Sequence, residues 1–74
     1  MNNVDFKYMK EALATELAEL LSKDMNLSVQ DSLRLLYNSA TYSGLKNPKT
    51  GLYFQSAGYV YSYLKSELTT GKLA

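Results

Sequence analysis

The sequence has no cysteine and no histidine among its 74 residues, and these two absences remove much of the chemistry available to a protein. Without cysteine there is no disulfide to brace a small fold and no thiolate to bind a metal. Without histidine there is no imidazole to ligate a metal, to carry a proton near neutral pH or to activate a serine. The composition therefore disfavours nucleophilic catalysis, and we expect no cofactor and no metal site.

Long hydrophobic runs are also missing. Uninterrupted apolar stretches extend over only a few residues, whereas a helix needs about 20 to cross a bilayer. Residues 1–5 contain neither the basic segment nor the apolar segment of a signal peptide. We therefore expect a cytoplasmic protein that makes no contact with a membrane.

Glycine and proline are scarce, with four and one respectively. The glycines are isolated from one another, so none belongs to a phosphate-binding loop or a dinucleotide fingerprint. The acids Glu11, Glu16 and Glu19 fall on the outward side of the first expected helix, where water would leave them without the apolar pocket that acid–base catalysis requires. We therefore expect neither an enzyme nor a small-molecule substrate.

The size of the chain limits its core. A domain of this length buries only about 60% of the surface exposed by its unfolded chain. Hydrophobic residues make up 46% of the sequence and charged residues 20%, which is typical of a folded globular domain. We expect one small domain over residues 1–74, stabilised by regular helix packing, by association with another chain, or by both.

Apolar residues at spacings of three and four predict a first helix over residues 3–25, capped by Asn2 or Asn3. After a corner at residues 26–27, Ser28 and Asp31 form a capping-box pattern that begins a second helix ending near residues 38–40. The inward face of the first helix is expected to consist of Phe6, Met9, Leu13, Leu17 and Leu20, widened on one side by Ala14, Ala18, Leu21 and Met25. That of the second is expected to consist of Val29, Leu33, Leu36, Tyr37 and Ala40.

The second half of the chain leaves alternatives open. Residues 41–46 are ambiguous, and one interpretation is a further helical turn broken at Gly44. Residues 47–51 contain Pro48 and Gly51 and predict a turn, after which residues 52–55 are expected to be extended. Ser56 can cap a last helix over residues 57–69 that Gly71 ends. The inward face of this helix would consist of Ala57, Val60, Tyr61, Leu64 and Leu68.

A hairpin is the competing interpretation, with strands at residues 52–55 and 59–64 that turn at residues 56–58. The apolar stripe continues through Leu64 and Leu68, which favours the helix. The predicted fold is therefore mostly α, with three helices: a helical hairpin, a short extended segment near residues 52–55 and a C-terminal helix.

Charge is unevenly distributed although the net formal charge is only +1. Residues 1–31 carry six acids and three lysines, a balance of −3, whereas residues 32–74 carry five bases and one acid, a balance of +4. A helix-turn-helix with Gly44 in its turn would place Pro48 inside the recognition helix, where proline costs about 3 kcal/mol. The bases are also scattered, which favours a solvated surface. They are Arg34, Lys46, Lys49, Lys65 and Lys72.

Several large side chains fall outside the expected inward faces. Tyr8 and Leu35 miss the stripes of the first and second helices, and Tyr59 and Tyr63 lie on the outward side of the last. Isolated exposed residues of this kind are common, and Leu35 would be core if the second helix were covered on both sides. Tyrosine is nevertheless enriched at interfaces, because it combines a large rigid ring with a polar hydroxyl. These four residues are therefore the candidate partner-binding residues.

Residues 27–68 contain a set of short motifs with a familiar spacing. They are Leu27-Ser28, Leu36-Tyr37 followed by Ser39, Thr50-Gly51-Leu52-Tyr53, Gln55-Ser56 and Tyr59-Val60. In these motifs the chain resembles small bacterial proteins grouped as domains of unknown function. The resemblance implies a short, mostly helical protein with a regulatory or accessory role, and it implies no activity, cofactor or site.

Taken together, these features predict a non-catalytic protein-binding or accessory module that uses an aromatic and aliphatic helix surface. We expect a protein partner or self-association. Two alternatives remain open. One is nucleic-acid binding through the basic residues 32–74, and the other is a structural subunit of an obligate oligomer.

Overall fold

The computed structural model describes residues 3–71, in which four α-helices and two short 3-10 helices follow one another. They are α1 (Asn3–Met25), α2 (Val29–Tyr37), α3 (Ala40–Lys46), η1 (Pro48–Thr50), η2 (Leu52–Phe54) and α4 (Ala57–Thr70). No strand is present in residues 3–71. The prediction of a mostly helical fold is confirmed, and so is the first helix with its bounds. The expected cap Asn2 and the base Lys72 lie outside the described residues.

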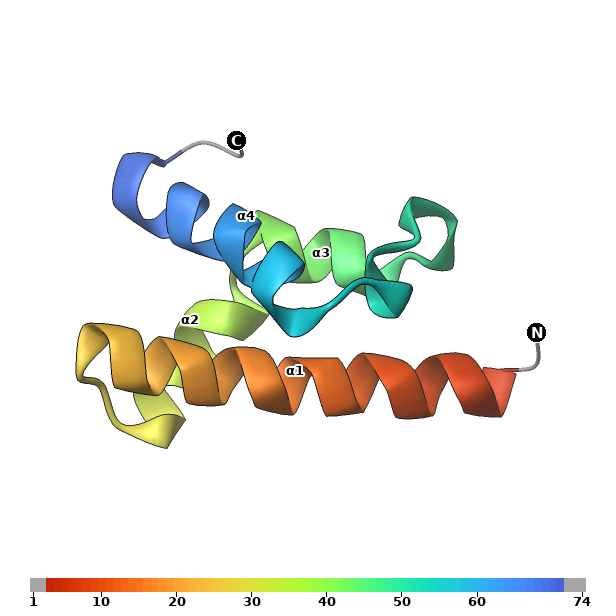
Figure 1. Ribbon diagram of the computed structural model, residues 1–74, viewed down its shortest axis with the longest axis horizontal. Coiled ribbons are helices and arrows are strands. Elements are labelled where there is room, and N and C mark those ends of the chain that lie inside the picture. Colours follow the sequence, from red (N-terminus) through yellow and green to blue (C-terminus); the bar gives the residue numbers. More distant parts are fainter. Residues whose placement is uncertain (1–2, 72–74) are drawn as a thin grey trace.

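The long helix α1 runs along the whole molecule, and the other helices lie against it (Figure 1). Its 23 residues span about 34 Å, close to the longest dimension of the molecule, 36 Å. The predicted corner follows at Asn26, whose φ of 55° is one that asparagine tolerates well. The amide of Leu27 donates to the carbonyl of Ser22 at 3.0 Å, which ends α1 and turns the chain into α2.

The core is mainly aliphatic, and every α-helix contributes to it. Tyr53 of η2 is the aromatic member, and the ring of Phe6 packs edge-on against it with centroids 4.8 Å apart. Both α2 and α4 pack on α1, and α3 packs on α4. The fully buried large aliphatic residues are Leu17, Leu21, Leu36, Leu45, Val60 and Leu64.

The prediction of three helices is wrong, because the chain breaks between α2 and α3 and the ambiguous residues 41–46 are helical. Ser39 causes the break. Its hydroxyl accepts a hydrogen bond from the amide of Tyr42 at 3.0 Å and donates one to the carbonyl of Leu36 at 2.6 Å. One side chain therefore ends α2 and caps α3.

The expected inward faces of α1 and α2 are wrong in part. Val29 and Tyr37 are 55% and 52% exposed, Ala40 is exposed, and the buried residues of α2 are Ser32 and Leu36. A serine can occupy the core here because the hydroxyl of Ser32 donates to the carbonyl of Ser28 at 2.9 Å.

On α1, the expected inward residues Leu13 and Leu17 are buried, and the face extends to the side on which Ala14, Ala18 and Leu21 were expected to widen it. Leu20 is 37% exposed, while Leu21 is fully buried. Ala14 and Ala18 are also buried, because their small side chains let other segments of the fold approach α1 closely on this side.

The predicted extended segment at residues 52–55 is wrong, and so is the alternative hairpin. Gly51 has a φ of 71°, and the amide of Gln55 donates to the carbonyl of Leu52 at 3.0 Å, so the chain forms the turn η2. Only Gln55 is extended. The predicted α4 is confirmed to within one residue, and the hydroxyl of Ser56 caps it by accepting from the amide of Tyr59.

Candidate functional site

The four residues predicted to bind a partner lie on three helices and do not form one patch. Tyr8 on α1 is 73% exposed, Leu35 on α2 is 40% exposed and Tyr59 on α4 is 47% exposed, while Tyr63 is half-buried. Leu35 is therefore not a core residue, and α2 is not covered on both sides.

Tyr59 and Tyr63 contact each other one turn apart on α4. Their hydroxyl oxygens are 2.9 Å apart, and their rings pack edge-on with centroids separated by 5.2 Å. The hydrogen bond to Tyr59 raises the pKa of Tyr63. Tyr59, Tyr63 and Glu67 follow one another at intervals of four residues, so they lie on the same side of α4. Glu67 contacts α3. The pair therefore stands on the α3 side of the helix.

Tyr8 lines a hollow of about 390 Å³ between α1 and the segment that connects η2 to α4. Phe54 also lines this hollow; it is 57% exposed and stacks on the buried Tyr53 with centroids 4.3 Å apart. Phe54 was not among the predicted partner-binding residues. Its exposure could have been predicted from the adjacent aromatic residues Tyr53 and Phe54, because a tight turn directs only one of two neighbouring rings into the core.

The hollow continues between α1 and α4 as two further hollows of about 340 and 490 Å³. The three hollows adjoin one another. Glu16 and Ala57 line both the hollow at Tyr8 and the one of 340 Å³, and Leu20 and Gly58 line both the hollow of 340 Å³ and the one of 490 Å³. Together they form what we call the α1–α4 groove. It follows α1 from Tyr8 to Asp24, which is about 24 Å.

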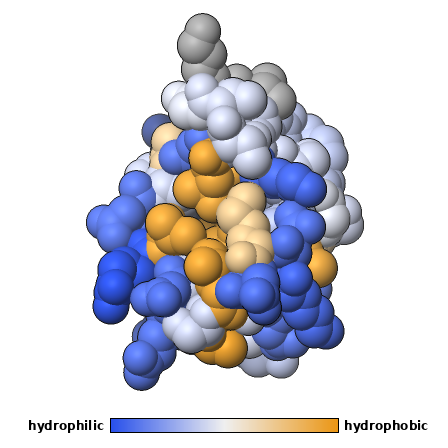
Figure 2. All heavy atoms as spheres, turned by 90° about the vertical axis from the view of Figure 1, so that its left-hand side faces the viewer, coloured by the Kyte–Doolittle hydropathy of each residue, from blue (hydrophilic) through white to orange (hydrophobic). Residues whose placement is uncertain are grey.

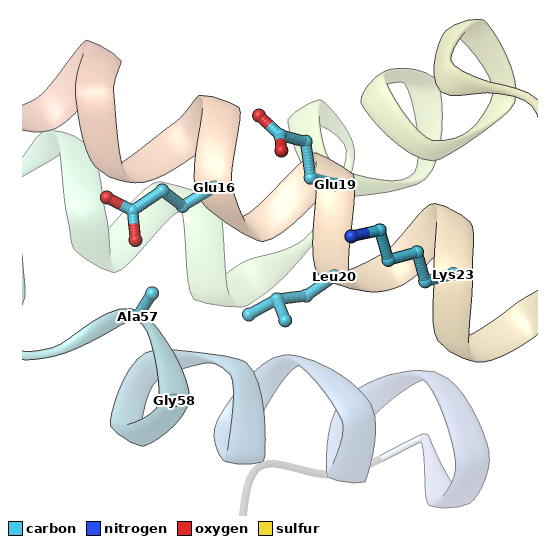
Figure 3. A pocket seen from close by; sticks show the side chains of 6 residues that line it. All are labelled: Glu16, Glu19, Leu20, Lys23, Ala57 and Gly58. Carbon is cyan, nitrogen blue, oxygen red and sulfur yellow. The ribbon is translucent and has the colours of Figure 1, made fainter.

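The middle of the α1–α4 groove has an apolar floor and charged sides. Leu20 and Ala57 point into the space between the two helices, whereas Glu19 points away from α4 (Figure 3). Glu16, Glu19 and Lys23 are exposed, and none of them forms an ion pair within residues 3–71. The charges at the rim are therefore available to another molecule.

The far end of the groove is closed by a cluster of Asp24, Tyr61 and Lys65. The hydroxyl of Tyr61 donates to Oδ2 of Asp24 at 2.7 Å, and Nζ of Lys65 lies 3.1 Å from the same oxygen. Burial and the bond to Asp24 raise the pKa of Tyr61 to about 12, and the bonds from Tyr61 and Lys65 lower the pKa of Asp24. Tyr61 is therefore protonated at neutral pH, and the cluster holds α4 against α1.

A second apolar area lies at the end of the molecule where α1 and α4 finish. Figure 2 shows hydrophobic side chains in a band across this end, with hydrophilic residues on both sides. Near the ends of α1 and α4 the chain has several half-buried aliphatic residues, of which Met25, Leu27 and Leu68 pack against the core.

The bases of the second half do not gather in one groove. Arg34 pairs with Asp31 at 3.4 Å, Lys65 pairs with Asp24, and Nζ of Lys46 lies 5.5 Å from the centre of the Tyr42 ring. Residues 3–71 hold no group of acidic side chains arranged to bind a metal ion. No helix in this part of the chain is both long enough and apolar enough to cross a membrane.

Comparison with protein-family models, with curated proteins and with solved structures finds no match to this chain. The resemblance to small bacterial proteins therefore stays a prediction. Any functional conclusion has to come from the α1–α4 groove itself.

Proposed function

We propose that the protein is a non-catalytic binding or accessory module that holds another protein chain in the α1–α4 groove. The observation that carries this proposal is the pair of exposed aromatic residues, Tyr8 at 73% and Phe54 at 57%, that line the same end of the groove. Large rigid aromatic side chains with a free face are the residues that contribute most to protein interfaces.

The rest of the groove supports the same function. Exposed Leu20 and small Ala57 and Gly58 form an apolar strip, and Glu16 and Lys23 form a charged rim. An apolar strip with a polar rim is the arrangement by which a groove binds one face of an amphipathic helix. The groove is open along its length, so it suits a row of side chains better than an enclosed small molecule.

Nucleic-acid binding has less support. Phosphate binding depends on lysines and arginines that are free to replace counterions. Arg34 and Lys65 are each paired with an acid, and the acids Glu16 and Glu19 stand on the rim of the groove and would repel phosphates.

The test is a photo-reactive benzoyl-phenylalanine placed at Tyr8, with the same group at exposed Gln30 of α2 as the matched control. We expect illumination in an extract of the producing cells to attach a protein chain at position 8 and not at position 30. Mass spectrometry of the product identifies the chain. Equal labelling at the two positions, or no labelling at either, would contradict the proposal.

A further inference from the structure

Gly58 is a glycine that nothing within this chain requires. It lies in the first turn of α4 and its φ is not positive, so any residue could adopt its backbone conformation. A Cβ atom at this position would meet no atom within 4 Å, so no close packing in the chain requires a glycine either. Glycine is a poor helix former. Gly58 therefore leaves open space on the wall of the α1–α4 groove, which gives room for the close approach of another chain.

The charges on the rim are ordered by sign around Leu20. Glu16 and Glu19 come before it on α1, and Lys23 comes after it. In an antiparallel pair of identical helices that cross at Leu20, Lys23 of one helix lies close in height to Glu16 and Glu19 of the other. Glu16 lies four residues before the crossing and Lys23 three residues after it, so their heights along the axis differ by only about 1.5 Å.

We propose that the α1–α4 groove binds a second copy of this chain. The two α1 helices pack antiparallel about a twofold axis near Leu20, and Lys23 of each copy faces Glu16 and Glu19 of the other. Each α1 then lies beside Gly58 of the opposite chain, whose missing side chain leaves room for it. This inference rests on the proposed function and names its partner.

The choice of a second copy over a different protein follows from this self-complementary pattern. A twofold interface places the same surface on both sides, so a surface of one sign repels itself. The groove of this chain carries both signs: Glu16 and Glu19 precede Leu20, Lys23 follows it, and Asp24, which also follows it, is paired with Lys65 of the same chain. A chain of 74 residues without a disulfide also gains stability from a partner subunit.

A charge exchange tests the geometry. Lys23→Glu makes the rim wholly acidic, and the double variant Glu16→Lys, Glu19→Lys makes it wholly basic. We expect sedimentation equilibrium at low ionic strength to show a dimer for the unmodified protein and an association at least about tenfold weaker for each variant alone, because like charges then face each other. An equimolar mixture of the two variants should recover a dimer, since every pair across the axis is then opposite in sign.

Matched controls use charges of α1 that do not line the groove. Lys7→Glu changes the net charge of α1 by as much as Lys23→Glu does, and Glu11→Lys changes it by half as much as the double variant. Both should leave the dimer intact. Gly58→Gln fills the space beside the opposite α1 and should weaken the dimer without loss of helix by circular dichroism.

Three results would overturn the second copy as the partner: a monomer at the highest attainable concentration, association of the wholly acidic variant as tight as that of the unmodified protein, or no recovery on mixing. These results leave the proposed function separately testable, because the photo-reactive group at Tyr8 would then attach a different protein. Failure of both experiments would remove both proposals.

Discussion

The two sides of α4 are built in opposite ways. On the side that faces α3, the carboxylate of Glu67 accepts hydrogen bonds from the amides of Ala40 and Thr41, at 2.7 and 2.9 Å, and from the hydroxyl of Thr41 at 2.8 Å. On the side that faces α1, Gly58 has open space beside it and Leu20 is 37% exposed. The α3 side is held by the bonds to Glu67, whereas the α1 side is held by the cluster of Asp24, Tyr61 and Lys65 at one end and is open beside Gly58.

The comparison separates what stabilises this fold from what is available to a partner. Glu67 places a negative charge on the N-terminal end of α3, where the helix dipole favours it and where amides lack helical partners. This contact joins residues 26 positions apart and holds α3 in place. The open part of the α1 side beside Gly58 has no such contact, and it is the surface that we propose for association.

The sharpest way to break this contrast is to remove the carboxylate. Glu67→Ala should lower the free energy of unfolding by about 2 kcal/mol, because it leaves the buried Thr41 and the start of α3 without an acceptor. Urea denaturation followed by circular dichroism measures the loss. Glu67→Gln keeps one acceptor oxygen and should cost less. Equal losses for the two variants would show that packing rather than hydrogen bonding is what Glu67 supplies.

Acid should weaken the same contact. Burial by itself raises the pKa of Glu67, but the hydrogen bonds from Ala40 and Thr41 outweigh it and hold the pKa below its usual value of 4.5. The unfolded chain therefore takes up this proton at a higher pH than the folded chain. The stabilisation that this contact contributes is fully present above pH 4.5, and it decreases as the pH drops towards the lowered pKa of Glu67.

The measurement is the free energy of unfolding as a function of pH, with Glu67→Gln as the control. Its profile should be flatter than that of the unmodified protein in this acidic range. Asp24, whose pKa is also lowered, contributes a slope of the same sign to both proteins. Parallel profiles would contradict the assignment.

A smaller effect is expected from the cap between α2 and α3. Ser39→Ala should destabilise the protein by about 1 kcal/mol, because the amide of Tyr42 loses its acceptor. Ser43→Ala is the matched control, since the exposed Ser43 donates only a long hydrogen bond of 3.5 Å to the carbonyl of Ser39. A loss of equal size for both serines would rule out capping as the cause.

The smallest effect is expected when alanine replaces either of two glycines, Gly58 of α4 or Gly44 of α3. Gly58→Ala should raise the stability of the isolated chain by about 0.5 kcal/mol, because alanine favours the helix and its Cβ meets nothing. Gly44→Ala should gain less, since its Cβ would come within 3.0 Å of Cδ1 of Leu52. Thermal unfolding at low protein concentration compares the two. A larger gain in stability from Gly44→Ala than from Gly58→Ala would contradict the finding that Gly44 is closely packed and Gly58 is not.

Local signals were sufficient for much of the fold. The ends of α1 and α4 followed from apolar spacing, from Ser56 and from Gly71, because caps act within one turn of their helix. The same reasoning failed at Ser39 and Ser32, because a serine in a helix-like stretch can cap, end or enter the core depending on which carbonyl its hydroxyl reaches.

The candidate site was only partly predictable. Tyr8 was identified from its position off the apolar stripe, and it does line the α1–α4 groove. Phe54 and Leu20 were not identified, because their exposure depends on how η2 turns and on which side of α1 the helix α4 rests. Periodicity locates an inward face to within about one residue, and a shift of one residue is a rotation of about 100°.

Composition and contacts within a few residues are enough to specify a helical protein without thiol or imidazole and to set where its longest helices begin and end. Packing between distant segments sets the rest: Glu67 caps α3, Tyr53 is buried while Phe54 is not, and α1 and α4 leave a groove between them. Such contacts join residues that are far apart in the chain, and their geometry depends on the packing of all the helices at once.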